Sequence, residues 1–180
     1  MKKYEIGDYL MHESSGVCQV ADIGEMALSG RGTEKMYYSL SPVFQTGSQV
    51  ITPMDGARVR MRDVKSKEEM EELLESAQDL EVIWEDNDRA RADKFKEHIA
   101  MFEPVELARV VKTVHIRKQM RLLAGKKVMS SDEKILQIAG KKLFEEMAFA
   151  MNEDVAEIEK KFYKGLTVTE EKCINELMKN

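Results

Sequence analysis

The stretch that decides the fold reads Arg60-Met61-Arg62-Asp63-Val64-Lys65-Ser66-Lys67-Glu68-Glu69-Met70, residues 60–70. Before it, residues 7–62 contain short runs of apolar and β-forming side chains that turn signals separate, as strands do. From Ser66 onward the apolar spacing becomes helical, and Ser66 with Glu69 has the form of a capping box. The change of period therefore predicts a β module that is followed by a helical module.

The β module is expected to contain five short strands, at residues 9–12, 17–23, 36–40, 50–52 and 57–61. Several short strands at this spacing suggest a small antiparallel barrel. Pro53 cannot donate to a strand ladder, which suits a strand end or an edge. The run 50–52 is the candidate edge, where unpaired N–H and C=O groups would accept a partner strand, although the pattern equally allows a strand wholly inside the barrel.

The first part of the helical module has clear start and stop signals. We expect Asn87 or Asp88 to cap a helix that runs to about Phe102, and Pro104 to occupy the first position of the next helix. Gly125 is a suitable residue to end it. The apolar face of that helix is expected to consist of Leu107, Val110, Val111 and Val114.

The second part is predicted from weaker signals. A capping box at Ser130 is expected to begin a helix, Asn152 to cap a shorter one through Phe162, and a box at Thr167 to begin a terminal helix. The apolar residues of the first of these are Ile135, Leu136, Ile138, Ala139, Leu143 and Met147. The predicted domains are residues 1–62, 63–165 and 166–180, so the fold class is α+β, with an all-α domain after the barrel.

The composition fits a soluble protein with a real core. The chain has 180 residues, of which 43% are hydrophobic, and a mean hydropathy of −0.44. No run approaches the roughly 20 apolar residues that span a bilayer, and no apolar region follows the charged N-terminus as in a secretory signal. Cys18 and Cys173 match no metal or disulfide motif. We therefore expect a cytoplasmic protein with reduced thiols and no membrane partner.

The charges divide on either side of Trp84, the only tryptophan. Residues 63–88 carry eleven acidic side chains against two basic ones, a net of −9, whereas residues 109–142 carry ten basic against two acidic, a net of +8. A basic segment in an acidic protein is a candidate polyanion-binding surface, although charged helix faces are commonly just solvated. Without further information, Trp84 would be interpreted as a core or interdomain residue.

Within the basic segment, Arg117 and Arg121 are four residues apart and so share one helix face, with Lys118 beside them. Lys126, Lys127 and Lys134 flank the predicted helix start at Ser130, where exposed N–H groups favour a phosphate. Such contacts would give affinity without sequence information.

The sequence contains no pattern typical of an enzyme. His12, His98 and His115 are too scattered for a metal motif, and no Walker or dinucleotide-binding glycine pattern occurs. Cys18 and His12 could be drawn as a nucleophile and base, but both lie on predicted strands. We expect no catalysis, no cofactor and no small-molecule substrate.

Five pieces of the chain, in their order and spacing over about residues 4–162, resemble the CarD/CdnL family of bacterial transcription regulators. They are Gly7-Asp8 with Gly16 and Val17; Met36-Tyr37-Tyr38-Ser39-Leu40; Val50-Ile51-Thr52-Pro53; Trp84; and Met129-Ser130-Ser131-Asp132-Glu133-Lys134 with Ala139, Leu143 and Glu146-Met147-Ala148.

The resemblance implies a Tudor-like or SH3-like barrel that binds the β subunit of RNA polymerase, similar to a module of the transcription–repair coupling factor. It also implies a helical domain that binds promoter DNA at the upstream edge of the bubble, where the tryptophan wedges into the minor groove and stabilises the open complex. The implied polymerase contacts are Met26, Val50, Ile51, Thr52 and Pro53. The candidate DNA contacts are Trp84, Arg89, Arg91, Arg117, Lys118, Arg121, Lys126, Lys127 and Lys134.

The sequence departs from the family pattern in two respects. Met26 and Ile51 stand where the family often has arginines on its polymerase-facing strands, so apolar contact should carry more of that affinity. The family's basic cluster after the tryptophan is replaced by residues 85–88, Glu-Asp-Asn-Asp, with arginines only at Arg89 and Arg91. An alternative function is a protein-interaction adaptor without direct DNA contact. A third is an RNA-binding barrel that stacks bases on Tyr37 or Tyr38.

Overall fold

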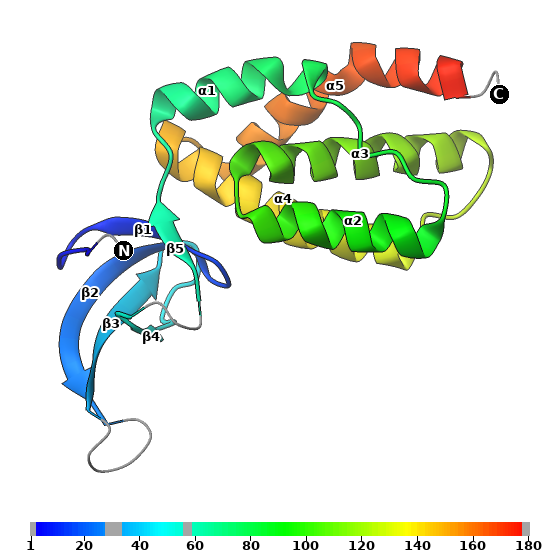
Figure 1. Cartoon of the computed structure of the whole chain (residues 1–180). Helices are drawn as coiled ribbons and strands as arrows, with labels where there is room; N and C mark the ends of the chain where they lie inside the picture. The colour runs from blue at the N-terminus through cyan, green and yellow to red at the C-terminus, as the bar shows by residue number, and fades with distance from the viewer. Residues whose placement is uncertain (1–2, 28–33, 56–58, 178–180) are drawn as a thin grey trace. The chain divides into compact units, whose positions relative to one another are not determined.

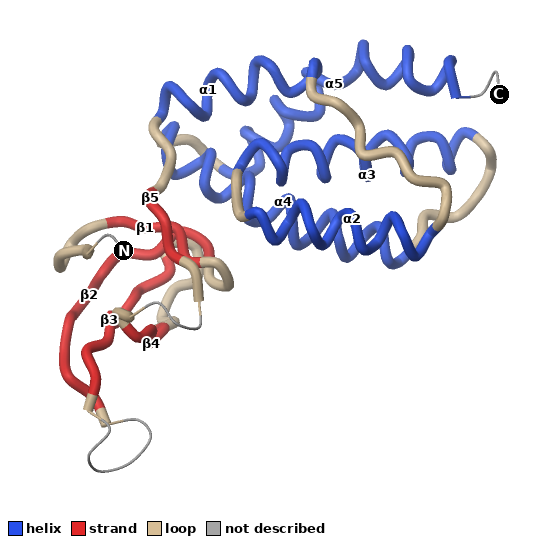
Figure 2. The backbone as a smooth tube through the Cα atoms, in the orientation of Figure 1, coloured by secondary structure: helices blue, strands red, loops and turns tan. Residues whose placement is uncertain are grey.

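The computed structural model in Figure 1 describes residues 3–27, 34–55 and 59–177, with side chains up to residue 167. The chain divides into two compact units, Met1–Lys65 and Ser66–Asn180. All the described strands lie in the first unit and all the described helices in the second (Figure 2). The α+β class predicted from the change of period is therefore confirmed.

The first unit is a five-stranded antiparallel sheet of order β4-β3-β2-β1-β5. Its strands are β1 (Tyr9–His12), β2 (Gly16–Met26), β3 (Lys35–Pro42), β4 (Val50–Pro53) and β5 (Met61–Asp63). The described pairings leave β4 and β5 as the two edges and do not join them, so closure into a barrel stays a prediction. The edge position expected for residues 50–52 is confirmed.

The sheet is strongly curled, as contacts between side chains of non-adjacent strands show. His12 on β1 bonds through its Nε2 to the Thr52 hydroxyl on β4 at 3.0 Å, although β2 and β3 lie between these strands in the sheet order. A register shift between Val20 and Asp22 marks a bulge, which bends and twists β2. The concave side encloses a small core that includes Leu10, Val20, Tyr38 and Leu40.

The fifth strand lies later than predicted. Residues 56–58 are outside the described residues, and the strand runs over Met61–Asp63 instead of 57–61. Arg60, which directly precedes this strand, bonds to Glu13 after β1. The Arg60 carbonyl accepts from the Glu13 N–H at 3.0 Å, and the Arg60 guanidinium donates to the Glu13 carboxylate at 2.6 Å. These contacts align residues 61–63 with β1, where Met61 pairs with His12.

The second unit contains α1 (Lys67–Ser76), the 3-10 turn η1 (Ala77–Asp79), α2 (Asp88–Met101), α3 (Pro104–Leu123), α4 (Ser130–Met151) and α5 (Val155–Leu177). The Ser66 capping box is confirmed: the Ser66 hydroxyl accepts from the Glu69 N–H and the Glu69 carboxylate from the Ser66 N–H. Asn87 caps α2, and Pro104 begins α3. All three starts follow from local side-chain chemistry.

Gly125 ends α3 as predicted. Its φ of +67° is in the left-handed region, its N–H donates to the carbonyl of Leu122 at 3.0 Å, and the N–H of Lys126 donates to the carbonyl of Arg121 at 2.8 Å. This pair of bonds is the Schellman motif, which satisfies the last carbonyls of the helix. The conformation of the chain at Gly125 and Lys126, where the connection to α4 begins, is therefore fixed by these two bonds.

Three predictions for the later helices are wrong. Ser130 is the first residue of α4 and Met129 caps the helix without a side-chain bond, so no capping box forms there. Asn152 ends α4 in the left-handed conformation, and it is the Asp154 carboxylate that accepts from the first N–H groups of α5. α5 continues through Thr167 without a break, so no separate terminal helix begins there.

The core of the second unit is built around α3. Its predicted stripe is buried: Leu107, Val110, Val111 and Val114 are at most 1% exposed. They pack with residues from the other helices, among them Met70, Phe95, Leu143, Met147 and Phe162. Each such side chain contributes about 1.5–3 kcal/mol through burial. Ile138, one of the apolar residues of α4, is 51% exposed.

No helix in the described part of the chain combines the length and the apolar character that a membrane span requires.

We predict that the first unit loses stability in acid through His12. His12 is 1% exposed, and burial lowers the pKa of its imidazole below 6.5, against an opposing effect of the Glu13 carboxylate. The Ser15 N–H lies 3.2 Å from Nδ1, so the neutral ring accepts there. Stability should fall as the pH drops below about 6.5, by at most about 1.4 kcal/mol per pH unit.

The measurement is urea unfolding at pH 7.5 and 5.5, followed by the amide NMR signals of β2 and β3. His12→Gln removes the titrating ring, so its unfolding free energy should depend less on pH than that of the wild type. An equal pH dependence in both proteins would contradict the assignment to His12.

We predict that Gly125→Ala destabilises the helical unit by about 1 kcal/mol, because an alanine pays for the left-handed conformation that Gly125 adopts. Gly165→Ala is the matched control: Gly165 lies inside α5, and an added Cβ there would meet no atom within 4 Å. It should be neutral or stabilising. Urea unfolding followed by Trp84 fluorescence measures both variants, and equal effects would refute the role of the conformation.

Candidate functional site

Trp84 is partly exposed and does not belong to the core of the helical unit. It lies in the segment between η1 and α2, directly after the buried Ile83. The indole Nε1–H donates to the Asp86 carboxylate at 3.0 Å. The interpretation of Trp84 as a core residue is therefore wrong, and part of its ring is accessible at the surface. Its interpretation as an interdomain residue stays untested.

The segment before Trp84 is fixed to α3 by buried polar contacts. The Lys112 ammonium donates to the carbonyl oxygens of Gln78 at 2.5 Å and Leu80 at 2.6 Å. The Ile83 N–H donates to the Thr113 hydroxyl at 2.9 Å. Because Lys112 and Thr113 are at most 1% exposed, these bonds are shielded from water. They determine where the indole lies.

Sequence reasoning missed the roles of Lys112 and Thr113. Lys112 was counted only as part of the basic segment, yet it is one of the most completely buried large side chains. The available signal was its position: Lys112 and Thr113 lie between Val111 and Val114, within the apolar stripe of α3. A lysine on a buried face needs acceptors, and unpaired backbone carbonyls of a neighbouring segment are suitable ones.

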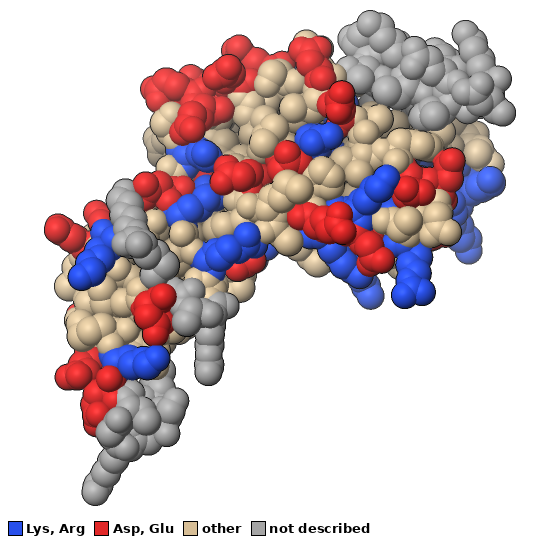
Figure 3. Space-filling view, in the orientation of Figure 1, with Lys and Arg blue, Asp and Glu red and all other residues tan. Residues whose placement is uncertain are grey.

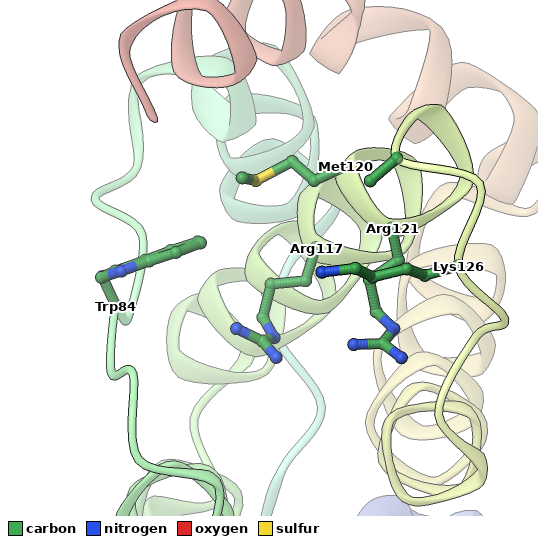
Figure 4. Close-up of a pocket in the computed structure, with 6 residues that line it drawn as sticks. Trp84, Arg117, Met120, Arg121 and Lys126 are labelled. Carbon is green, nitrogen blue, oxygen red and sulfur yellow. The ribbon is translucent and has the colours of Figure 1, made fainter. Parts of the chain in front are cut away.

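Positive groups gather beside the indole (Figure 4). The Arg117 guanidinium carbon lies 5.6 Å from the centroid of the Trp84 ring, within cation–π range. Trp84, Arg117, Met120, Arg121, Ala124 and Lys126 line an open pocket of about 220 Å³. Arg121 is oriented by its Nε, which donates to the carbonyl of Lys127 at 2.8 Å.

Arg117 occupies an unusual environment. Burial lowers the pKa of its guanidinium, and the neighbouring Arg91 acts in the same direction. The Arg117 Nε lies 3.7 Å from the Asp132 carboxylate, and neither that Nε nor the facing Asp132 oxygen makes a hydrogen bond. An arginine stays protonated at neutral pH even so, and therefore this site holds concentrated positive charge that is incompletely neutralised.

Arg91, predicted to contact DNA, is buried at 2% exposure. Its guanidinium donates to the Asp88 carboxylate at 2.5 Å and to the Glu85 carbonyl at 3.1 Å. Arg91 thus stabilises the start of α2, and its buried guanidinium cannot reach a DNA phosphate. Arg89, in contrast, is exposed.

The remaining predicted cations lie at the surface of the same unit. Lys118 on α3 is partly exposed, and Lys126, Lys127 and Lys134 are exposed around the connection between α3 and α4. In Figure 3, acidic side chains gather over α1, whereas basic side chains project at the lower right of the helical unit. Away from α1, acidic and basic side chains are interspersed on this face, so the charge division of the sequence is only partly a division in space.

The acidic run after Trp84 is paired locally. Glu85 forms an ion pair with Lys94 at 2.9 Å, and a hydrogen bond from that Lys94 is the main reason why the pKa of Glu85 is lowered. Asp86 accepts from the indole, Asn87 caps α2, and Asp88 pairs with Arg91. The carboxylates and the amide of residues 85–88 therefore bond to groups around Trp84 and the start of α2.

In the first unit, the predicted polymerase contacts differ in exposure. Ile51 on β4 is 42% exposed, whereas Thr52 is 2% exposed and bonds His12. Val50, Pro53 and Met26 are partly exposed. The side chain of Thr52 is thus directed inward, so an added strand would meet Thr52 through its backbone alone.

The comparison with known families concerns this first unit. Residues 4–65, about a third of the chain, match the family model described as CarD-like/TRCF RID domain. The first unit is therefore similar to this CarD-like domain, and the match suggests RNA polymerase as its partner. The resemblance to the CarD/CdnL family is confirmed for these residues. No curated protein is similar enough to this chain to count as a match.

We predict that Thr113→Val destabilises the helical unit by about 1–3 kcal/mol, because the nearly isosteric side chain leaves the buried Ile83 N–H without an acceptor. Thr113→Ser keeps the hydroxyl and should remain closer to the wild type. Urea unfolding measures the free energy, and the Trp84 emission spectrum reports the position of the indole. Valine and serine variants of equal stability and emission would contradict the anchoring role.

Proposed function

We propose that this protein is a cytoplasmic, non-enzymatic transcription regulator that binds the RNA polymerase β subunit and promoter DNA together. The first unit attaches to polymerase, and the helical unit contacts DNA at the upstream edge of the bubble. The observation that carries the DNA half is the accessible Trp84 indole, held on α3 beside Arg117, Arg121 and Lys126. A rigid aromatic group among cations suits a minor-groove wedge.

On the polymerase side, the proposed contact is strand addition at the edge strand β4. An edge strand presents unpaired N–H and C=O groups, and the exposed side chain of Ile51 adds apolar area. The curl of the sheet, with His12 bonded to Thr52, supports the proposal that the module is a Tudor-like barrel.

On the DNA side, we propose that Trp84 stabilises the open complex while Arg89, Arg117, Lys118, Arg121, Lys126, Lys127 and Lys134 meet phosphates. Opening a base step costs a few kcal/mol, and a DNA edge that is already melting lowers this cost. An indole that binds only the opened form increases its population. Attachment to polymerase raises the local concentration of a weak DNA-binding unit, so free duplex should bind poorly.

The alternatives have less support. An adaptor without DNA contact leaves the cations around Trp84 without a role. An RNA-binding sheet that stacks a base on Tyr38 conflicts with the burial of that ring at 1% exposure, while Tyr37 is only partly buried.

The decisive test compares Trp84→Ala and Ile51→Glu. Trp84→Ala should shorten the open-complex lifetime about tenfold, equivalent to about 1.4 kcal/mol, while binding to the β subunit is unchanged. Ile51→Glu should weaken binding to the β subunit, because a charge enters the apolar contact. Circular dichroism checks that both variants fold. An unchanged lifetime with Trp84→Ala would refute the wedge.

We predict a salt dependence for the contact with a polymerase–promoter complex. Lys118→Ala and Lys134→Ala should each reduce the slope of log binding constant against log salt by about 1, because each lysine neutralises one phosphate. Lys160→Ala is the matched control, since Lys160 on α5 is exposed and pairs with Glu157. Binding that does not respond to salt would favour the adaptor.

A further inference from the structure

The pocket beside Trp84 has two chemically different sides. The Trp84 indole, the Met120 side chain and the Ala124 methyl group provide apolar surface, whereas Arg117, Arg121 and Lys126 provide positive charge (Figure 4). Its volume is about 220 Å³ and it is open to solvent, so it can hold part of a drug-sized ligand while the rest stays in water. The pocket therefore fits a small ligand with one flat apolar part and one anionic part.

Two of the three cations retain unused donors. The Arg121 contact found among the described residues uses Nε alone, and Lys126 is exposed without a described side-chain contact. Arg117 contributes its charge instead, because its Nε is buried and faces the Asp132 carboxylate at 3.7 Å. One guanidinium group can donate two parallel hydrogen bonds to the oxygens of a phosphate, and an ammonium group adds further donors.

A nucleotide combines the two required parts in one molecule. Its base presents a flat π surface that stacks on an indole and tolerates a thioether and a methyl group around it. Its phosphate provides three acceptor oxygens and negative charge for the guanidinium and ammonium groups. Neither a nucleoside nor inorganic phosphate would use both sides of the pocket.

The carboxylates after Trp84 limit the directions in which a strand can leave the indole, whereas a single nucleotide is not limited in this way. Glu85, Asp86 and Asp88 follow the indole closely in sequence, and Asp86 contacts it directly. A strand that places one base on the indole carries phosphates in both directions, so some would approach these carboxylates. A single nucleotide carries its phosphate at one end, which can remain at the cations.

We propose that the pocket beside Trp84 binds a free nucleoside monophosphate, with the base against Trp84, Met120 and Ala124 and the phosphate on Arg117, Arg121 and Lys126. This ligand shares Trp84, Arg117, Arg121 and Lys126 with the proposed DNA contact and would compete with DNA for them, but its binding requires neither polymerase nor DNA. The same chemistry could come from an unpaired nucleotide within a strand, and the experiment separates these sources.

The test uses Trp84 fluorescence, because the chain has a single tryptophan. The full chain is titrated with AMP, adenosine, inorganic phosphate and a single-stranded hexanucleotide. Stacking should quench the emission saturably, with AMP binding at least about tenfold more tightly than adenosine or phosphate. Lack of saturable quenching by AMP would overturn the proposal, and so would quenching by the hexanucleotide alone or equal affinities for AMP and adenosine.

Two variants assign the ligand to the pocket. Lys126→Ala removes an exposed cation and should weaken AMP binding about fivefold or more without changing adenosine binding. Lys160→Ala removes a lysine that is not among the pocket residues and should leave AMP binding unchanged. Equal effects of the two variants would overturn the site. Open-complex lifetimes, measured without nucleotides, test the DNA proposal separately.

Discussion

The arrangement of the helical unit depends on the polar contacts between α3 and residues 78–83. Lys112 and Thr113 lie on the buried face of α3, where apolar residues would otherwise be expected, and they satisfy backbone groups of a segment that has no regular structure beyond η1. A buried ammonium group is costly unless its donors are used. The bonds of Lys112 that offset this cost, together with the bond between Thr113 and Ile83, also hold residues 78–83 in place, and Trp84 directly follows these residues.

Much of the fold could be predicted where a signal was local. Ser66, Asn87 and Gly125 act through bonds to residues within a few positions, and Pro104 acts through its fixed φ and missing N–H, so the sequence alone indicates the helix ends they form. The errors at Asn152 and Ser130 have a different origin. Each residue type suits more than one helix position, and the path of the chain, which is set by tertiary packing, decides between them.

The candidate site was predictable in composition but not in geometry. The division of charge and the solitary tryptophan pointed to the correct region, yet the sequence did not separate buried cations from exposed ones. Arg91 and Lys112 look like surface residues in the sequence, and both are buried. Whether an arginine faces a phosphate or a backbone carbonyl depends on contacts between residues far apart in the chain, which periodicity does not encode.

The bond between His12 and Thr52 has a consequence for any molecule that pairs with β4. A strand of only four residues at the edge of a sheet would ordinarily be conformationally flexible. A partner that pairs with such a strand has to order it, which costs entropy. Here the His12 side chain from β1 holds β4 in place through its hydrogen bond to Thr52 on the inner side of the curled sheet. The edge is therefore preorganised, and association loses less conformational freedom than the shortness of β4 suggests.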